Sequence, residues 1–285
     1  MTAVAVFEAG SWRNLRHHLF SATYPVVAAV QGARGPDDWE TVLVNFGFSG
    51  PESCSLYGWH PRREPVKLYD AFLFAGETDM LTVRLNEYGD LVDAVVVLES
   101  ELSVDGRLRE VAPLPLDDEV FAGWPAEKRR PVLVHHVVRV AEISNSSKDY
   151  SARAAIDSHW LEAYQRRRMV SALLGLGLTD GNVFVIGDLD EIPRRAVMQL
   201  LRGCKGAPTH LALEMRRHLY GFGTIEPGSK SSHAVARTYS SRVETDWAAH
   251  HQILGNTVLA DAGWHCSWSA PSHSLHSPAR PFGSV

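Results

Sequence analysis

The sequence has few cysteines, no long apolar run and no excess of positive charge. Its three cysteines, Cys54, Cys204 and Cys266, are widely spaced and form no CxxC pair, so the pattern of a cysteine zinc site is absent. This spacing is compatible with one disulfide and a free thiol, or with three reduced thiols. The net charge of −5 gives no electrostatic basis for binding nucleic acid or an anionic membrane.

No segment has the length of a membrane span. The most apolar N-terminal stretch, Leu19 to Val30, is broken by polar residues and Pro25 and falls well short of the ~20 residues that a span needs. The first residues also lack a basic segment followed by a clean apolar core, so a standard signal peptide is not evident. We therefore expect no membrane span in this chain, which is compatible with a soluble protein.

Periodicity divides the chain into three parts. Residues 1–65 contain many Gly and Pro breakers, which predicts an irregular N-terminal extension with one or two strands, such as Thr41 to Phe46. Residues 66–268 have the regular pattern of a folded domain. Residues 269–285 are rich in Ser, Pro and His and have no periodicity, which predicts a disordered tail.

Strand and helix patterns alternate through the folded part. Leu68 to Phe74 reads as a strand, Thr78 can cap a helix that Gly89 ends, and Ala94 to Leu98 is an apolar run typical of a parallel strand buried on both faces. This order predicts a βαβ unit in an α/β fold. Further predicted elements are a strand at Val132 to Val140, a helix at Ser158 to Gly175, a strand at Asn182 to Ile186 and a strand with alternating Leu211, Leu213 and Met215.

An acidic cluster follows the strand that ends at Ile186. Asp188, Asp190 and Glu191 come directly after it, and in open α/β sheets ligands bind at the carboxyl ends of strands. Carboxylates two residues apart on an extended segment point the same way and can share a divalent cation, which commonly bridges to substrate phosphates. The alternative is a solvated acidic turn.

Five ordered segments resemble one known family. Residues 183–193, which read VFVIGDLDEIP, resemble the DxDEIP signature of glycosyltransferase family 17, the β-1,4-mannosyl-glycoprotein 4-β-N-acetylglucosaminyltransferases. Residues 58–74, 90–100, 215–222 and 262–268 resemble further family segments in the same order. The resemblance implies a GT-A-like fold, with a mixed, mostly parallel sheet flanked by helices, and makes residues 66–268 the catalytic domain.

The same resemblance implies a reaction and its partners. The donor would be UDP-N-acetylglucosamine, the acceptor a β-mannose of a glycoprotein N-glycan, and the anomeric centre would invert. A divalent cation, Mn²⁺ or alternatively Mg²⁺, would assist departure of the diphosphate. The expected location is the Golgi or secretory pathway.

Site residues follow from the matching positions. Asp188, Asp190 and His265 would hold the metal ion, and Glu99, Arg166 and Asp188 would bind the donor. Glu191 and Asp261 are candidates for the catalytic base, with Glu214 as a further option. Trp264 and Tyr220 would bind the acceptor sugar through their aromatic faces. The simpler alternatives are an i, i+4 ion pair of Arg166 with Glu162 and core packing of the two aromatic residues.

Two other functions compete with a transferase. An apolar strand followed by DxD also opens the pattern of haloacid dehalogenase-type hydrolases, although Ile192 stands where that pattern wants Thr or Val. A non-catalytic sugar-nucleotide or glycan-binding protein is the third interpretation, because the chain departs from the family pattern from Ser269 onward. Phosphate release without nucleotide-sugar preference would indicate the hydrolase, and UDP binding without turnover would indicate the binding protein.

Overall fold

The computed structural model describes most of the chain after residue 50 and three short strands before it. The tail at 269–285 and most of the predicted N-terminal extension lie outside the described residues. The described residues are 4–7, 27–30, 41–44, 51–103, 107–111, 114, 120–121, 123–146, 158–220, 223–231, 233–242 and 257–267.

The predicted βαβ unit is present in a ten-stranded sheet, towards the side that ends at β7. Strand β5 (Leu68–Leu73) is followed by helix α2 (Thr78–Tyr88) and strand β6 (Ala94–Ser100), and the two strands pair in parallel. Thr78 is the first residue of α2, and Glu77 occupies the N-cap position. The prediction that Thr78 caps the helix is therefore wrong by one position.

Two further strands extend the parallel part of the sheet. Strand β7 (Val132–Val138) pairs in parallel with β6, and β8 (Val183–Asp188) pairs in parallel with β5. Helix α4 (Ser158–Gly175) precedes β8 and has the bounds predicted from the sequence. Parallel pairing is thus confirmed for the run β8-β5-β6-β7.

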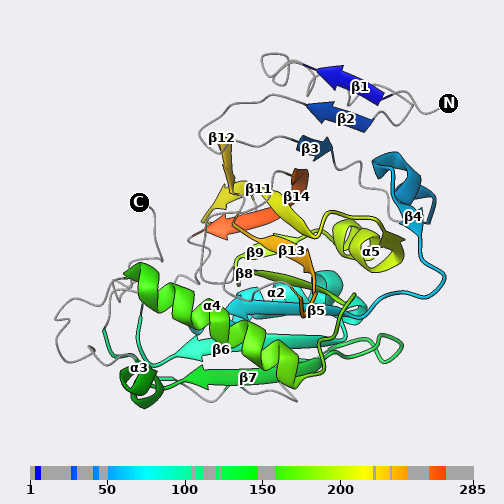
Figure 1. Cartoon of the computed structure of the whole chain (residues 1–285). Coiled ribbons are helices and arrows are strands. Elements are labelled where there is room, and N and C mark those ends of the chain that lie inside the picture. The colour runs from blue at the N-terminus through cyan, green and yellow to red at the C-terminus, as the bar shows by residue number, and fades with distance from the viewer. Residues whose placement is uncertain are drawn as a thin grey trace.

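The other half of the sheet is mixed. Strand β13 (Val235–Thr238) pairs antiparallel with both β8 and β11 (His210–Leu219), so it interrupts the parallel order. The full order is β3-β14-β11-β13-β8-β5-β6-β7 (Figure 1). Strands β3 (Thr41–Val44) and β14 (Thr257–Ser267) pair in parallel, whereas β12 (Ile225–Ser231) and β9 (Glu191–Pro193) pair antiparallel with β11 and β14.

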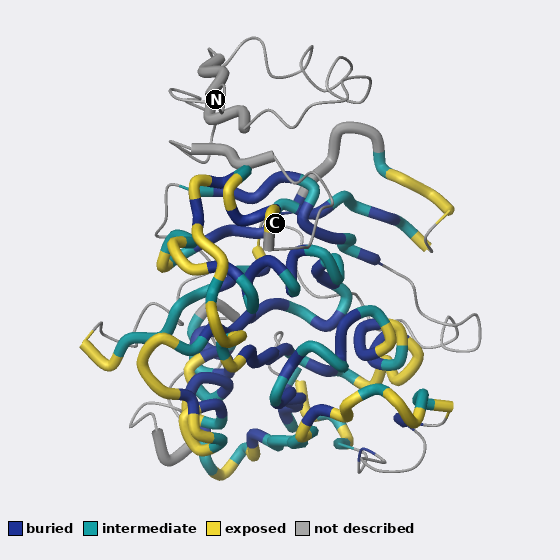
Figure 2. Tube along the Cα trace, turned by 90° about the vertical axis from the view of Figure 1, so that its right-hand side faces the viewer, coloured by how far each residue is buried: buried dark blue, intermediate teal, exposed yellow. Residues whose placement is uncertain are grey.

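Helices cover both faces of the sheet, and each face has its own hydrophobic core. Helices α2 and α5 (Arg195–Gly203) pack with Val95 and Val97, whereas α4 packs with Val96 and Leu98. All seven residues of β6 are buried, and Figure 2 shows buried residues along the central strands. Each buried Val or Leu contributes about 1.5–3 kcal/mol relative to an exposed one. Because successive side chains of β6 enter opposite cores, this strand stabilises the packing on both faces of the sheet.

A disulfide links the segment before β5 to the end of α5. Cys54 bonds to Cys204 across a sequence separation of 150 residues, while Cys266 is a buried free thiol. Tyr57 and Trp59 join the core that contains α2 and α5. Part of the segment predicted as an irregular extension therefore packs against the folded domain.

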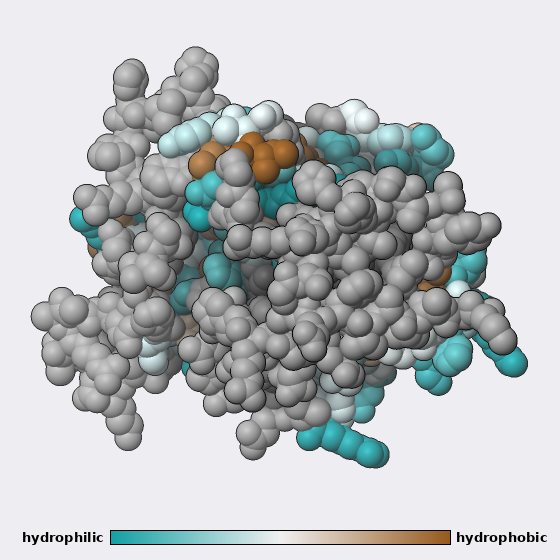
Figure 3. Space-filling view, turned by 90° about the horizontal axis from the view of Figure 1, so that it is seen from above, coloured by the Kyte–Doolittle hydropathy of each residue, from teal (hydrophilic) through white to brown (hydrophobic). Residues whose placement is uncertain are grey.

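The remaining described elements are short. None of the helices in the described ranges is long and apolar enough to cross a bilayer. Seen from above in Figure 3, the coloured surface is mainly hydrophilic, with small hydrophobic clusters. The remaining short elements are β1 (Val4–Phe7), β2 (Val27–Val30), β4 (His60–Pro61), β10 (Cys204–Lys205), α3 (Val140–Ser146) and the 3-10 helices η2 (Pro51–Tyr57) and η3 (Gly89–Leu91).

Candidate functional site

The carboxyl ends of three neighbouring strands meet at one edge of the sheet. Leu73 of β5 lies opposite Asp188 of β8 and also opposite Leu98 of β6. The chain turns at Leu189 and Asp190 and returns as β9, which begins at Glu191. The acidic cluster is therefore at the edge where ligands bind in sheets of this type.

Asp188 and Arg166 are brought together at this edge. Nη2 of Arg166 donates a hydrogen bond of 3.1 Å to Oδ1 of Asp188, whose side chain is 32% exposed. Nε of Arg166 also donates to Oε1 of Glu162 at 3.0 Å. Burial alone would lower the pKa of Arg166, but the charges of Asp188 and Glu162 outweigh it and raise that pKa. Arg166 thus makes both the helical ion pair and a contact to the cluster.

Asp190 and His265 also meet. Nε2 of His265 lies 3.3 Å from Oδ2 of Asp190, and the backbone N–H of Cys266 donates to the Asp190 carbonyl at 2.9 Å. This contact follows from the pairing of β9 with β14, in which His265 is opposite Glu191. Burial alone would lower the pKa of His265, but the hydrogen bond to Asp190 and the nearby carboxylates raise it.

Glu191 is the buried member of the cluster. Its Oε1 accepts a hydrogen bond from the Ser231 hydroxyl at 2.8 Å, and its Oε2 accepts one from the backbone N–H of Asp188 at 3.1 Å. Nδ1 of His233 lies 3.8 Å from Oε1. Burial, and then the charge of Asp188, raises the pKa of the Glu191 carboxyl, whose side chain has 0% exposure.

Arg84 contacts the acidic turn and was not predicted from the sequence. Its Nη1 donates to the backbone carbonyls of Asp188, Leu189 and Glu191 at 2.9, 3.2 and 2.8 Å. Its Nε and Nη2 donate to the two carboxylate oxygens of Asp70 at 2.9 and 2.8 Å. The available signal was an acid inside an apolar strand, followed by an arginine on the apolar side of the next helix.

Glu99 occupies a separate position along the same edge. Its carboxylate accepts a hydrogen bond from Nη2 of Arg109 at 3.0 Å and lies 3.1 Å from Nε2 of His135. Burial raises its pKa, although the charge of Arg109 opposes the change. Two strand spacings separate β6 from β8, so Glu99 lies roughly 10 Å across the sheet from Asp188. Neither of these two partners of Glu99 belongs to the acidic cluster.

Asp261 lies on a bulged part of β14, upstream of His265. The register between β11 and β14 shifts next to it, and its φ is +55°. Its carboxylate pairs with Arg194 at 2.9 Å and with Arg216 at 2.7 Å. Glu214, the other base candidate on these strands, is half-buried on β11. The two arginines thus bind Asp261 at a place distinct from the contacts of Asp188 and Asp190.

The two predicted acceptor-binding aromatic residues have different surroundings. Trp264 is half-buried against the core, and the Arg194 guanidinium lies 4.4 Å from its ring centroid. Tyr220 is 73% exposed at the end of β11, with a φ of +60°. Core packing therefore accounts in part for Trp264 but not for Tyr220.

The described residues contain no ready-made cluster of three or more metal-ligating side chains. Asp190 and His265 nevertheless offer an oxygen and a nitrogen ligand in contact, and Asp188 presents a partly exposed carboxylate on the same turn. Divalent ions in phosphate-using sites often bind one or two protein carboxylates and complete their shell with substrate phosphate and water. The oxygen and nitrogen ligands of Asp188, Asp190 and His265 fit a metal site of this kind, in which the substrate completes the coordination.

An α/β sheet with carboxylates and an arginine at the carboxyl end of a buried strand is suited to handling a phosphate-bearing substrate. Comparison with known proteins defines the class as glycosyltransferase. The sequence model of glycosyltransferase family 17 matches residues 41–272, and the chain belongs to that family. The resemblance carried by the DLDEIP segment is thereby confirmed.

Curated relatives carry one name. The chain is 28% identical over 239 residues to β-1,4-mannosyl-glycoprotein 4-β-N-acetylglucosaminyltransferase of Rattus norvegicus and to that of Homo sapiens, and 29% identical to that of Mus musculus. Each match covers 73% of this chain but only 41–42% of the relative, so the chain spans about two fifths of the relatives' length. No solved structure matches it.

Proposed function

We propose that the protein transfers N-acetylglucosamine from UDP-N-acetylglucosamine to a β-mannose of an N-glycan, in a β-1,4 bisecting linkage and with inversion. The observation that carries the proposal is the group formed by Asp188, Asp190, His265 and Arg166 at the carboxyl end of β8, in a chain of family 17. The names of the curated relatives support the transferred sugar and the acceptor. A GT-A-like arrangement of the mixed sheet is part of the same proposal.

The diphosphate of the donor would lie against this group. Asp188, Asp190 and His265 would hold a divalent ion, Mn²⁺ or Mg²⁺, which when bound would stabilise the charge of the departing diphosphate. Arg166 would donate to a phosphate oxygen, because a guanidinium matches phosphate geometry. Glu99 would contact the uridine side of the donor from β6, which lies two strand spacings from β8.

Inversion requires a base for the acceptor hydroxyl. The hydroxyl oxygen bonds to C1 of the sugar as the C1–O bond to UDP breaks, UDP leaves with the bonding electrons, and the hydroxyl proton passes to a carboxylate. Glu191 and Asp261 are the proposed candidates. Complete burial and two hydrogen bonds support a positioning role for Glu191, whereas the Asp261 side chain is 25% exposed and can meet an acceptor.

The acceptor would be a glycoprotein N-glycan. Tyr220 offers an exposed ring and Trp264 a partly exposed one, and such rings can stack on the apolar faces of sugars. An enzyme with this acceptor would act in the secretory pathway, with the Golgi as the proposed compartment.

A transfer assay tests the proposal. The protein is incubated with UDP-N-acetylglucosamine, Mn²⁺ and a biantennary N-glycan, and the product is analysed by mass spectrometry and linkage analysis. We expect one added N-acetylhexosamine on the β-mannose, and loss of the product when Mn²⁺ is chelated. UDP binding without any turnover would contradict the transferase, and phosphate release without preference for a nucleotide sugar would indicate a hydrolase.

A further inference from the structure

Arg84 is a fully buried charge in contact with the turn that carries the acidic cluster. Its side chain and that of Asp70 both have 0% exposure and form a two-bond ion pair at 2.9 and 2.8 Å. The Tyr88 hydroxyl donates to the same Asp70 carboxylate at 2.8 Å. Burying a charge is costly unless hydrogen bonds satisfy it, and these partners satisfy one side of the guanidinium.

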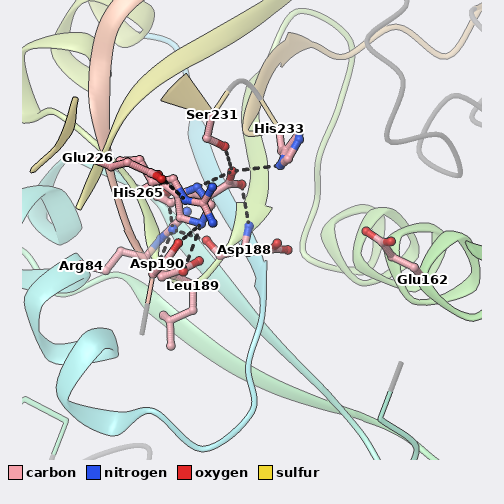
Figure 4. Close-up of polar contacts among 12 residues, drawn as sticks. Arg84, Glu162, Asp188, Leu189, Asp190, Glu226, Ser231, His233 and His265 are labelled. Atoms are coloured by element: carbon pink, nitrogen blue, oxygen red, sulfur yellow. Dashed lines mark hydrogen bonds and ion pairs between the residues drawn. The ribbon is translucent and has the colours of Figure 1, made fainter. Parts of the chain in front are cut away.

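The other side of the guanidinium is directed at the acidic turn. Nη1 of Arg84 donates to three backbone carbonyls within four residues, those of Asp188, Leu189 and Glu191. Buried carbonyls need donors, and a single lysine or apolar side chain could not supply this set while also pairing with Asp70. In Figure 4, Arg84 and Glu162 lie on opposite sides of the turn.

Two arginines therefore hold the turn from opposite faces of the sheet. Arg84 comes from α2, which packs in one core, and binds the backbone of the turn. Arg166 comes from α4, which packs in the other core, and binds the carboxylate of Asp188. With its carbonyls bound from the α2 side, the turn leaves the partly exposed carboxylates of Asp188 and Asp190 accessible to a ligand.

We propose that Arg84 is a positioning residue of the site, which fixes the 188–191 turn through its carbonyls so that Asp188 and Asp190 can act on one ligand. Asp70 orients Arg84 through its two hydrogen bonds to the guanidinium. This inference rests on the proposed function, because it assigns Arg84 to the metal and diphosphate site of that function. Because its side chain is fully buried, Arg84 would act through the turn and not by touching the ligand itself.

The test compares Arg84→Lys with Tyr88→Phe. Both changes weaken the buried network, but only Arg84→Lys removes donors from the turn. We expect Arg84→Lys to weaken Mn²⁺-dependent UDP affinity by about 10- to 100-fold, as removal of residues that orient metal ligands does. Hydrogen exchange of residues 188–191 should accelerate without any ligand present. Tyr88→Phe should leave both properties near those of the original protein.

A second variant covers the case in which Arg84→Lys fails to fold. Replacing both charges together, Asp70→Leu with Arg84→Met, removes the carbonyl donors without leaving an unpaired buried charge. A folded variant of either kind with unchanged exchange at the turn and unchanged UDP affinity would overturn the inference. Absence of Mn²⁺-dependent UDP binding in the original protein would instead contradict the proposed function, with the exchange result still deciding the role of Arg84.

Discussion

At the scale of single residues, the sequence pattern predicted the region of the candidate site. It did not predict which side chains contact one another there. The strand followed by DxDE indicated a site at the carboxyl end of the strand, where Asp188 and Asp190 lie, and the structure brings Arg166 and His265 into contact with them. The roles that the family resemblance implies for these residues stay predictions. Arg84 was not predicted, because its role depends on tertiary contacts between residues 104 to 107 positions apart.

Arg166 gives the first prediction. Arg166→Ala should weaken UDP affinity by about 10- to 100-fold, because a charge-assisted hydrogen bond contributes about 1.5–3 kcal/mol. Arg167→Ala is the matched control, since that neighbouring arginine is exposed on α4. Calorimetric titration with UDP and Mn²⁺ measures both variants, and circular dichroism checks the fold. Equal affinities for the two variants would show that Arg166 does not bind the diphosphate.

His210 gives a prediction about pH. Both of its ring nitrogens are buried without a hydrogen-bond partner among the described residues, and burial, followed by the charge of Arg237, lowers its pKa from 6.5 to about 4. The unfolded chain therefore binds more protons between these values, so stability should fall as pH drops from 6.5 towards 4. His210→Leu should flatten that part of a plot of melting temperature against pH. An unchanged slope would show that His210 does not titrate in this way.

At the scale of elements, local patterns predicted the bounds of those helices and strands whose buried positions can be read from apolar spacing along the chain. The bounds of α2 and α4, and the buried run of β6, follow from apolar spacing and from Gly89 and Gly175. Helix α5 and strand β9 were not predicted. Strand β9 has three residues and forms only because β14 supplies its partner, which no local pattern encodes.

Gly263 tests how closely β9 and β14 must approach. A Cβ on Gly263 would lie 2.3 Å from the carbonyl oxygen of Ile192, whereas one on Gly203 would meet nothing within 4 Å. Gly263→Ala should cost about 1–3 kcal/mol through overpacking and displace Glu191 from its strand pairing. Gly203→Ala should be nearly neutral. Chemical denaturation compares the two, and equal stability would mean that the strand pair tolerates separation.

At the scale of the whole molecule, the sequence predicted the class of fold but not its full topology. Alternating strands and helices indicated an α/β sheet, and the mixed pairing agrees with that class. The antiparallel place of β13, between β8 and β11, is determined by contacts remote in sequence. The division at residue 65 stays a prediction, although β3 joins the sheet and Cys54 reaches the core before that point.

The disulfide gives the prediction at this scale. Closing a loop of 150 residues restricts the unfolded chain, so reduction of the Cys54–Cys204 bond should lower stability by about 4–5 kcal/mol. Cys54→Ala with Cys204→Ala should reproduce the loss, and Cys266→Ala should not. Denaturation with and without a reductant measures it. A midpoint unaffected by reductant would show that the bond does not stabilise the folded state.

The central claim is that the 188–191 turn holds a cation against a nucleotide diphosphate. Its most direct test is calorimetric titration of UDP, with and without Mn²⁺, into the original protein and into Asp190→Ala. We predict that Mn²⁺ increases UDP affinity in the original protein and that Asp190→Ala abolishes this increase while the fold is retained. Normal Mn²⁺-dependent affinity in Asp190→Ala would contradict the claim.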